Sequence, residues 1–314
     1  MATAEARDQV TVEDLILRGY EARRAGDLLV AGEALEQAVL QSKAGPTRRA
    51  LAAEVAEFWL AQDKGYRAVR LYRRLNYVRS EVDTLILDGD YEAALAVARQ
   101  VGYQRGEAIA LVRLGSSGKG DRKVNSERIK QALKILDEND LKRDKADLLF
   151  EVAKRYKPAA QLYAELQQFY LQARCYELAG KVSDGIPYYS DAKTQLKLEL
   201  EEVQPRLQRA IAVYRDEKLP FVARERARRD VILYSGKTSV IYEQLAVSFH
   251  RTGNSNAYKL VDKAIQYTER QRDTLRDGGR DKFGPTLARY LKLDERLREL
   301  AELKRTLQTQ PPPK

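Results

Sequence analysis

The residue types that most often carry catalysis or bind metals are scarce in this sequence. The chain has 314 residues, with one histidine, His250, and one cysteine, Cys175. A single histidine cannot build a histidine-based metal cluster, and a single cysteine cannot form a disulfide within the chain. Adjacent carboxylates such as Glu201 and Glu202 splay around a helix instead of facing each other. We therefore expect a protein that is not an enzyme and that has no cofactor and no metal site.

Both single residues have structural interpretations. His250 lies near the end of an expected helix, where the helix dipole favours a cation, so we expect a capping or surface histidine. Cys175 stands within a helical pattern, where a buried structural thiol is expected.

Gly118 and Lys119 form the nearest approach to a phosphate-binding loop. Such a loop needs a glycine five positions before Gly118, where Arg113 stands. It also needs a serine or threonine after the lysine, where Gly120 stands. The pattern therefore fails, and we expect no nucleotide site there.

Four arginines, Arg67, Arg70, Arg73 and Arg74, occur in a segment that contains no aspartate or glutamate between positions 64 and 80. Positions 67, 70 and 74 share one face of a helix, where like charges repel unless an anion offsets them. We interpret this stripe as a binding surface for an acidic partner; the alternative is a solvated helix face. Tyrosines that could line a groove are Tyr20, Tyr66, Tyr72, Tyr77 and Tyr103.

Further basic clusters lie toward the C-terminus, where basic residues outnumber acidic residues most strongly. The net charge of the whole chain is +10. Clusters of this kind can bind phosphates, but interleaved acids such as Glu225 and Asp273 favour solvated faces. A nucleic-acid-binding helical-repeat protein is therefore the alternative function. We call the arginines of these clusters the secondary basic patch; its residues are Arg224, Arg228, Arg229, Arg272 and Arg276.

Apolar residues recur at spacings of three and four almost throughout, which predicts an all-α fold. The longest apolar run, residues 93–98, is far shorter than the ~20 residues that cross a bilayer. The first ten residues show no signal-peptide core, so we expect a cytoplasmic protein without membrane insertion. The glycines expected to end helices or form turns are Gly26, Gly89, Gly102, Gly115, Gly180, Gly236 and Gly253.

Small and apolar residues recur in patterns typical of helical hairpins. In the first hairpin Gly26 is the turn between two seams of small and apolar residues, and similar halves surround Gly89 and Gly253. Alanine–tyrosine pairs such as Ala160 with Tyr163 and Ala173 with Tyr176 repeat the theme at close helix crossings. The seams of the first hairpin are Leu15, Gly19, Ala22, Ala31, Leu35 and Ala38.

These segments resemble tetratricopeptide repeats (TPR), and the chain is similar to a divergent TPR-like α-solenoid over residues 12–190 and 238–268. The resemblance implies stacked hairpins with a peptide-binding face. Peptide-binding members clamp a C-terminal carboxylate with Lys and Asn on the first helix, where this chain has Ile16 and Tyr20. The usual carboxylate clamp is therefore missing.

The C-terminal part follows another pattern. A seam between Asp191 and Lys218 alternates spacings of four and three and predicts a long helix, either kinked at Pro205 or followed there by a second helix. A leucine seam between Thr286 and Gln308 predicts a last helix that caps the body or pairs with a second copy of the chain.

From these patterns we divide the chain into six parts. The expected boundaries are a flexible N-terminus (1–11), TPR-like repeats (12–190), a helical region with the long helix and one further hairpin (191–276), a mobile linker (277–284), a C-terminal helix (285–309) and a disordered tail (310–314). We expect a scaffold or adaptor that holds a peptide or partner helix, of acidic character, in a solenoid groove.

Overall fold

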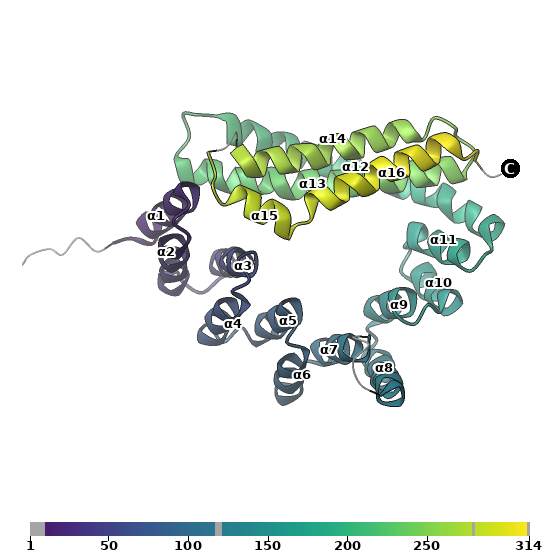
Figure 1. Cartoon of the computed structure of the whole chain (residues 1–314), viewed down its shortest axis with the longest axis horizontal. Coiled ribbons are helices and arrows are strands. Elements are labelled where there is room, and N and C mark those ends of the chain that lie inside the picture. Colours follow the sequence, from purple (N-terminus) through teal and green to yellow (C-terminus); the bar gives the residue numbers. More distant parts are fainter. Residues whose placement is uncertain (1–9, 117–120, 278–279, 313–314) are drawn as a thin grey trace, which may run out of the picture.

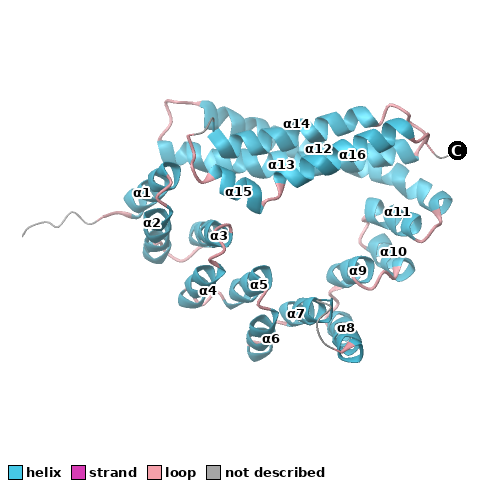
Figure 2. Ribbon diagram, viewed as in Figure 1, coloured by secondary structure: helices cyan, strands magenta, loops and turns pink. Residues whose placement is uncertain are grey.

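The computed structural model describes residues 10–116, 121–277 and 280–312, and these residues form helices and loops without a strand (Figure 2). The all-α prediction is therefore confirmed for them. Gly118 and Lys119, and the last two residues of the expected tail, lie outside the described residues.

Short helices build the first half of the chain, and each packs against its neighbours in sequence. Figure 1 shows them as an arc, with α3, α5, α7 and α9 on its inner side and α4, α6, α8 and α10 outside. These helices are α1 (Val12–Ala25), α2 (Leu28–Gln41), α3 (Pro46–Leu60), α4 (Gly65–Arg74), α5 (Val78–Asp88), α6 (Tyr91–Gln100), α7 (Gln104–Ser116), α8 (Arg122–Glu138), α9 (Lys142–Glu151), α10 (Tyr156–Glu165) and α11 (Phe169–Leu178).

Long helices form the second half. α12 (Val182–Arg215) has 34 residues and α13 (Phe221–Arg251) has 31, so they are about 50 Å and 46 Å long at 1.5 Å per residue. They pack with α14 (Tyr258–Arg276), α15 (Gly284–Tyr290) and α16 (Leu293–Thr309) into a bundle that lies across the open side of the arc (Figure 1).

The arc meets this bundle at both ends. Its last helix, α11, packs on α12, which continues the chain, whereas its first helix, α1, packs on α13, which lies more than 200 residues further along the chain. Arc and bundle together therefore form a closed ring of helices (Figure 1). This differs from the open, elongated array that hairpin repeats alone would give.

Local sequence signals explain the first hairpin. Thr11 and Asp14 form a capping box at the start of α1, and Gly26 ends α1 in a left-handed conformation with φ of 88°. Within the hairpin, a Cβ at position 19 would lie 2.6 Å from Leu35 Cγ. The glycine therefore permits the close crossing of α1 and α2 that the spacing of small residues predicts.

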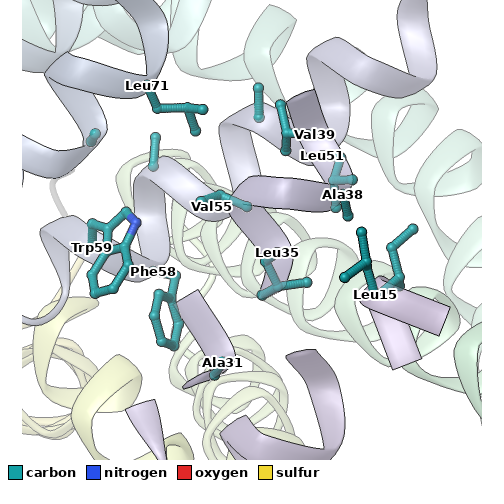
Figure 3. Packing of buried hydrophobic residues seen from close by; sticks show 14 of the residues in the cluster. Leu15, Ala31, Leu35, Ala38, Val39, Leu51, Val55, Phe58, Trp59 and Leu71 are labelled. Carbon is teal, nitrogen blue, oxygen red and sulfur yellow. The ribbon is translucent and has the colours of Figure 1, made fainter. Parts of the chain in front are cut away.

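The hydrophobic interior is a succession of clusters that follow the helices. The largest joins α1 to α4 around Trp59, Leu35 and Phe58, and Figure 3 shows these side chains packed together. Phe283, from the segment between α14 and α15, joins the same cluster with its ring 4.7 Å from that of Phe58. The arc and the C-terminal segment therefore share an apolar core where the ring closes.

Several predicted boundaries need correction. The long helix begins at Val182 and runs through Pro205 as one helix, so no second helix starts there. Gly236 lies inside α13 instead of ending a helix, and its lack of a side chain leaves room for Gln271 of α14. The helix expected at 285–309 is divided at Lys292, which has φ of 52°.

The linker differs from expectation, and the leucine seam follows the first of its two predicted alternatives, packing on the body of the chain. Asp281 and Phe283, in the segment 277–284, are buried against the arc, so this part of the segment is a docking element instead of a mobile linker. Leu293, Leu300 and Leu307 of the leucine seam are buried within the chain. The seam thus serves internal packing, which removes the basis for self-association through it.

Candidate functional site

The predicted arginine stripe lies on α4, on the outer side of the arc (Figure 1). Arg70, Arg73 and Arg74 are exposed, and Tyr66, one turn before Arg70, is 58% exposed. We call these four residues, with Arg67, the arginine face. The buried side of α4 contains Ala68, Val69, Leu71 and Tyr72, which pack toward α3 and α5.

Part of this positive charge is already offset. Arg73 pairs with the buried carboxylate of Glu81 at 2.7 Å. The Arg67 guanidinium lies 4.5 Å from the centre of the Trp59 ring. Burial raises the pKa of Glu36 on α2, and the charges of Arg67 and Arg74 oppose that rise. Within the described residues Arg70 and Arg74 form no ion pair of 4 Å or less, so they remain available to an anion.

The tyrosines predicted to line a groove lie in different environments. Tyr77 is half-buried and lies next to the C-terminal end of α4. The Arg49 guanidinium lies over the Tyr77 ring, 5.9 Å from the ring centre. Tyr20 is buried, and its hydroxyl donates a hydrogen bond of 3.0 Å to Glu54. The prediction for Tyr20 is therefore wrong, because this ring fills the core beneath α1.

The secondary basic patch is not one surface. Arg228 is 2% exposed and pairs with Asp281, while Arg229 pairs with Glu54. Arg272 is half-buried and lies 3.4 Å from Asp294. Arg224 is half-buried as well, and Arg276 alone of the five is exposed. The correction follows from folding, because interleaved acids and distant carboxylates pair with these arginines inside the chain.

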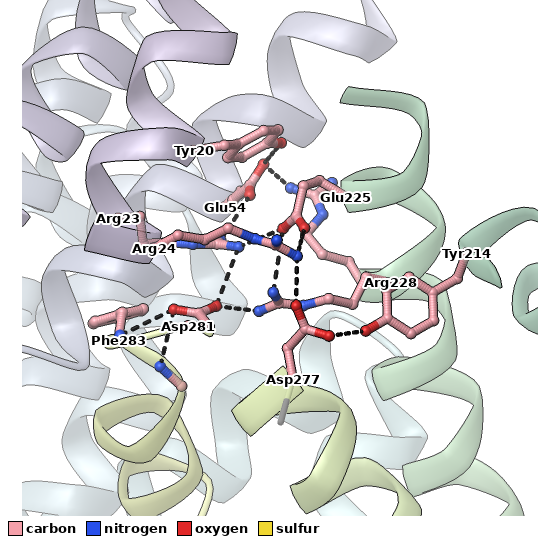
Figure 4. A network of polar contacts seen from close by, with 12 residues as sticks. Tyr20, Arg23, Arg24, Glu54, Tyr214, Glu225, Arg228, Asp277, Asp281 and Phe283 are labelled. Carbon is pink, nitrogen blue, oxygen red and sulfur yellow. Dashed lines mark hydrogen bonds and ion pairs between the residues drawn. The ribbon is translucent and has the colours of Figure 1, made fainter. Parts of the chain in front are cut away.

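A buried ionic network closes the ring between α1 and α13 (Figure 4). Glu225 of α13 forms ion pairs with Arg23 at 2.8 Å and with Arg24 at 2.6 Å. Arg24 also pairs with Asp277 at 2.7 Å, and Arg228 pairs with Asp281. We call this network the N-terminal junction.

Most charged side chains of the junction are buried and have several polar partners. Asp281 accepts backbone hydrogen bonds from Phe283 and Gly284, at 2.9 and 3.2 Å. The side chains of Arg23, Glu225, Arg228 and Asp281 are at most 7% exposed. Burial and the nearby Arg228 charge lower the pKa of Arg23, while Asp281 and Glu225 counteract that effect. Each charge at the junction is thus held by an opposite charge from a distant part of the chain.

A second polar hub joins the other end of the arc to the bundle. Glu177 of α11 accepts hydrogen bonds from Arg174 at 2.6 Å and from the Tyr189 hydroxyl of α12 at 2.5 Å, and it pairs with Arg251 of α13. Burial tends to raise the pKa of Glu177, but the Tyr189 hydrogen bond and the two arginine charges lower it below its ordinary value. We call this hub the distal junction.

Between the two junctions, α13 borders a groove on the side of the bundle that faces the arc. One hollow, of about 360 Å³, is lined by α3 residues such as Ala53 and by α13 residues up to Leu233. The next hollow, of about 680 Å³, shares Leu233 and continues along α13 past Val240, opposite α9, α11 and α12. We call the two together the inner groove.

Apolar side chains are left uncovered in this groove. Leu233 is 50% exposed and Val240 is 42% exposed, two turns apart on the same face of α13. Lys237 lies between them, and Arg206 and Glu202 of α12 line the wider hollow. The lining therefore combines exposed apolar side chains with charged side chains of both signs.

The acidic side chains near the narrow end of the groove are protonated more readily than usual. Burial raises the pKa of Glu57, and the charge of Arg23 opposes the rise. Burial also raises the pKa of Asp83 on α5, opposed by Arg105. Both line a neighbouring hollow of about 380 Å³ beside Tyr290.

The two single residues that could carry chemistry are buried. His250 is 1% exposed, with Nε2 placed 2.9 Å from the backbone carbonyl oxygen of Gln310, to which it can donate. The prediction of a capping or surface histidine is therefore wrong about its burial, and the contact also attaches the start of the expected tail. Cys175 is buried as predicted, and burial raises the pKa of its thiol to about 12.

The inner groove and both junctions were not predicted. The exposed stripe on α13 at 226, 230, 233, 237 and 240 has helical spacing, but it alternates charged and apolar residues and so gives no signal of its own. Arg23 and Glu225 of the N-terminal junction, and Glu54 beside Arg23, look like ordinary surface charges until the fold brings them together.

Comparison with known proteins adds no assignment. No protein-family model matches the chain, and no curated protein matches it significantly. Within the described ranges, none of the helices combines the length and the apolar character that crossing a membrane needs. Among the same residues, no group of three or more His, Cys, Asp or Glu side chains is placed to hold a metal ion.

Proposed function

We propose that the protein is a non-enzymatic adaptor that holds a peptide or a helix of a partner protein in the inner groove. The observation that carries this proposal is the exposure of Leu233 and Val240 along two hollows on α13 that share Leu233. Exposed apolar side chains in a hollow that excludes bulk water are a typical basis for protein recognition.

The size of the groove suits a short segment. The α13 residues that line it run from Arg228 to Gln244, which is about 24 Å at the helical rise. About seven residues of extended chain, or four turns of helix, would cover that length. Such a segment could bury Leu233 and Val240 and place polar groups near Lys237, Arg206 and Glu202.

The arc supplies one wall of the groove, and we propose that it is a divergent array of TPR-like hairpins. Supporting this assignment are the successive helical pairs and the close crossing at Gly19. In such arrays the inner helices contact the bound segment. Here Ala53 of α3 and Arg143 of α9 line the hollows and take that position.

The acidic character expected for the partner needs revision for this groove. That expectation rests on the arginine stripe of α4, a helix on the outer side of the arc. The lining of the wider hollow includes Arg143, Arg206 and Lys237 together with Glu199 and Glu202. Apolar contact is therefore the main source of affinity that we propose here, and charge has a smaller part.

Photo-cross-linking in the native cell tests the proposal. A photoreactive amino acid at position 233 or 240 should cross-link to a defined partner, and Leu233→Glu should abolish the cross-link formed from position 240. The matched control places the same probe at Leu198, an exposed apolar residue of α12 that lines neither hollow of the groove.

The same experiment can refute the adaptor function. Equal cross-linking from positions 198, 233 and 240 would show non-specific contact, and absence of protein cross-links from both groove positions would contradict the proposal. Leu233→Glu should leave the melting temperature within a few degrees of the parent value, because this side chain is half exposed.

A further inference from the structure

A second surface, on the opposite side of the arc, has a different chemistry. The arginine face of α4 combines two arginines without an ion pair among the described residues, Arg70 and Arg74, with the exposed ring of Tyr66. We propose that the arginine face binds single-stranded nucleic acid, with Arg70 and Arg74 on phosphates and Tyr66 against a base. This proposal is independent of the inner groove.

The geometry of α4 sets these groups in one row. Residues four apart on a helix are about 6 Å apart along the axis and lie on the same side. Tyr66, Arg70 and Arg74 follow that spacing. A flexible single strand presents phosphates and bases together, so it can place phosphates at the arginines while a base stacks on the tyrosine.

The identity of the basic residues supports a phosphate ligand. All four basic residues between Gly65 and Arg74 are arginine, whose planar guanidinium binds phosphate oxygens through two hydrogen bonds. Three of the four have a carboxylate nearby: Arg73 pairs with Glu81, and the charges of Arg67 and Arg74 both act on Glu36. Because the four arginines outnumber the carboxylates Glu36 and Glu81, and Arg70 and Arg74 form no ion pair of 4 Å or less among the described residues, the face keeps a positive excess.

Neighbouring residues add to the positive charge of the arginine face. Arg49 is exposed and lies over Tyr77 just after α4 ends, adding a cation close to the C-terminal end of that helix. A net charge of +10 for the whole chain favours encounter with a polyanion. An acidic peptide would also engage the arginines, but it would leave the exposed ring of Tyr66 without a role. Tyr66 therefore favours nucleic acid over acidic protein.

Fluorescence anisotropy with the full chain tests this inference. The probes are a labelled 20-nucleotide oligo-dT and a labelled ten-residue oligo-glutamate peptide, titrated at several salt concentrations. The double variant Arg70→Glu/Arg74→Glu should lose at least tenfold in affinity for the oligonucleotide. The milder Arg70→Gln/Arg74→Gln should reduce the slope of log affinity against log salt by about 1.4, at about 0.7 per phosphate contact.

Two further variants separate the arginine face from net charge. Arg122→Glu/Arg209→Glu makes the same change of charge at two exposed arginines on α8 and α12, and it should keep oligonucleotide affinity within about threefold of the parent. Tyr66→Ala should weaken binding by about fivefold or more, whereas Tyr66→Phe should retain it, because stacking needs the ring and not the hydroxyl.

Three outcomes would overturn the inference. They are the absence of oligonucleotide binding at low salt, equal losses from the arginine-face variant and its charge-matched control, and binding of the oligo-glutamate peptide but not of the oligonucleotide. The last outcome would assign the face to an acidic protein.

Discussion

Ion pairs in this protein differ greatly in how much they stabilise the fold, because some are buried between distant segments and others are exposed to solvent. Arg23 has a side-chain exposure of 7% and contacts Glu225 at 2.8 Å. Lys134 and Glu138 form a pair of similar chemistry on α8, but both are mostly exposed. Removing one partner of a buried pair leaves the other charge unpaired in a poorly solvated place, whereas an exposed charge returns to water.

We therefore predict that Arg23→Ala lowers the free energy of unfolding by about 3–5 kcal/mol. The matched control Lys134→Ala should lower it by about 0.5 kcal/mol or less. Urea denaturation followed by circular dichroism measures both. Similar losses from the two variants would show that the N-terminal junction is hydrated and weak.

Glu177 gives the distal junction a dependence on pH. Its pKa is lowered in the folded protein, so the stability it contributes is present above its ordinary value of 4.5 and is lost as the pH falls through the lower, folded value. Glu177→Gln should therefore destabilise the protein at pH 7 and flatten the loss of stability between pH 5 and pH 3. Denaturation curves at these pH values test it, and an unchanged slope would contradict it.

Residue patterns predicted burial well where packing decides it and poorly where pairing decides it. Cys175 was predicted as a buried thiol from its helical surroundings, and it is buried. Arg228 and His250 are buried too, although their types favour the surface. Their partners, Asp281 and Gln310, are 53 and 60 residues away, so no local pattern could reveal the burial.

At the scale of helices, small residues decide how closely neighbours approach. A Cβ at Gly32 of α2 would lie 2.0 Å from the Trp59 ring of α3, which is closer than any real contact. The sequence predicted this kind of crossing from the spacing of Gly19, Ala31 and Leu35. It could not specify that Trp59 fills the space beside Gly32.

We predict that Gly32→Ala forces the Trp59 ring to move and costs about 1–3 kcal/mol of stability, despite the better helix propensity of alanine. Tryptophan fluorescence should report the change directly, because Trp59 is the single tryptophan of the chain. The control, Gln37→Ala at an exposed position of the same helix, should leave stability and emission nearly unchanged. A more stable Gly32→Ala variant would refute the close contact.

The sequence predicted that the chain is helical, but it predicted the lengths of the helices and their packing partners less well. The periodicity of three and four predicted helices throughout, and the seam near Leu196 predicted a long one. That seam packs on α13 around Ile241 and Leu245. The leucines of the last helix, expected to cap the body or to dimerise, cover α14, because α14 and α16 lie side by side in the bundle.

At the scale of the whole molecule, the closed ring gives the inner groove two walls. Helices of about 50 Å reach across the arc, and the N-terminal junction then fixes α1 to α13. The sequence suggested hairpin repeats and a long helix, but the contact between Arg23 and Glu225 spans 202 residues. Closure is set by such distant pairs, which single-sequence periodicity does not encode.

The closed ring is the central claim, and a distance between α1 and α13 tests it most directly. Spin labels at Glu21→Cys and Arg226→Cys, both at exposed positions, can be placed in a chain carrying Cys175→Ala and measured by double electron–electron resonance. We predict one narrow distance distribution in this chain. Addition of Arg23→Glu and Arg24→Glu should give a longer and broader one, because the junction carboxylates then face like charges. A broad distribution before those substitutions, or the same narrow one after them, would contradict the account.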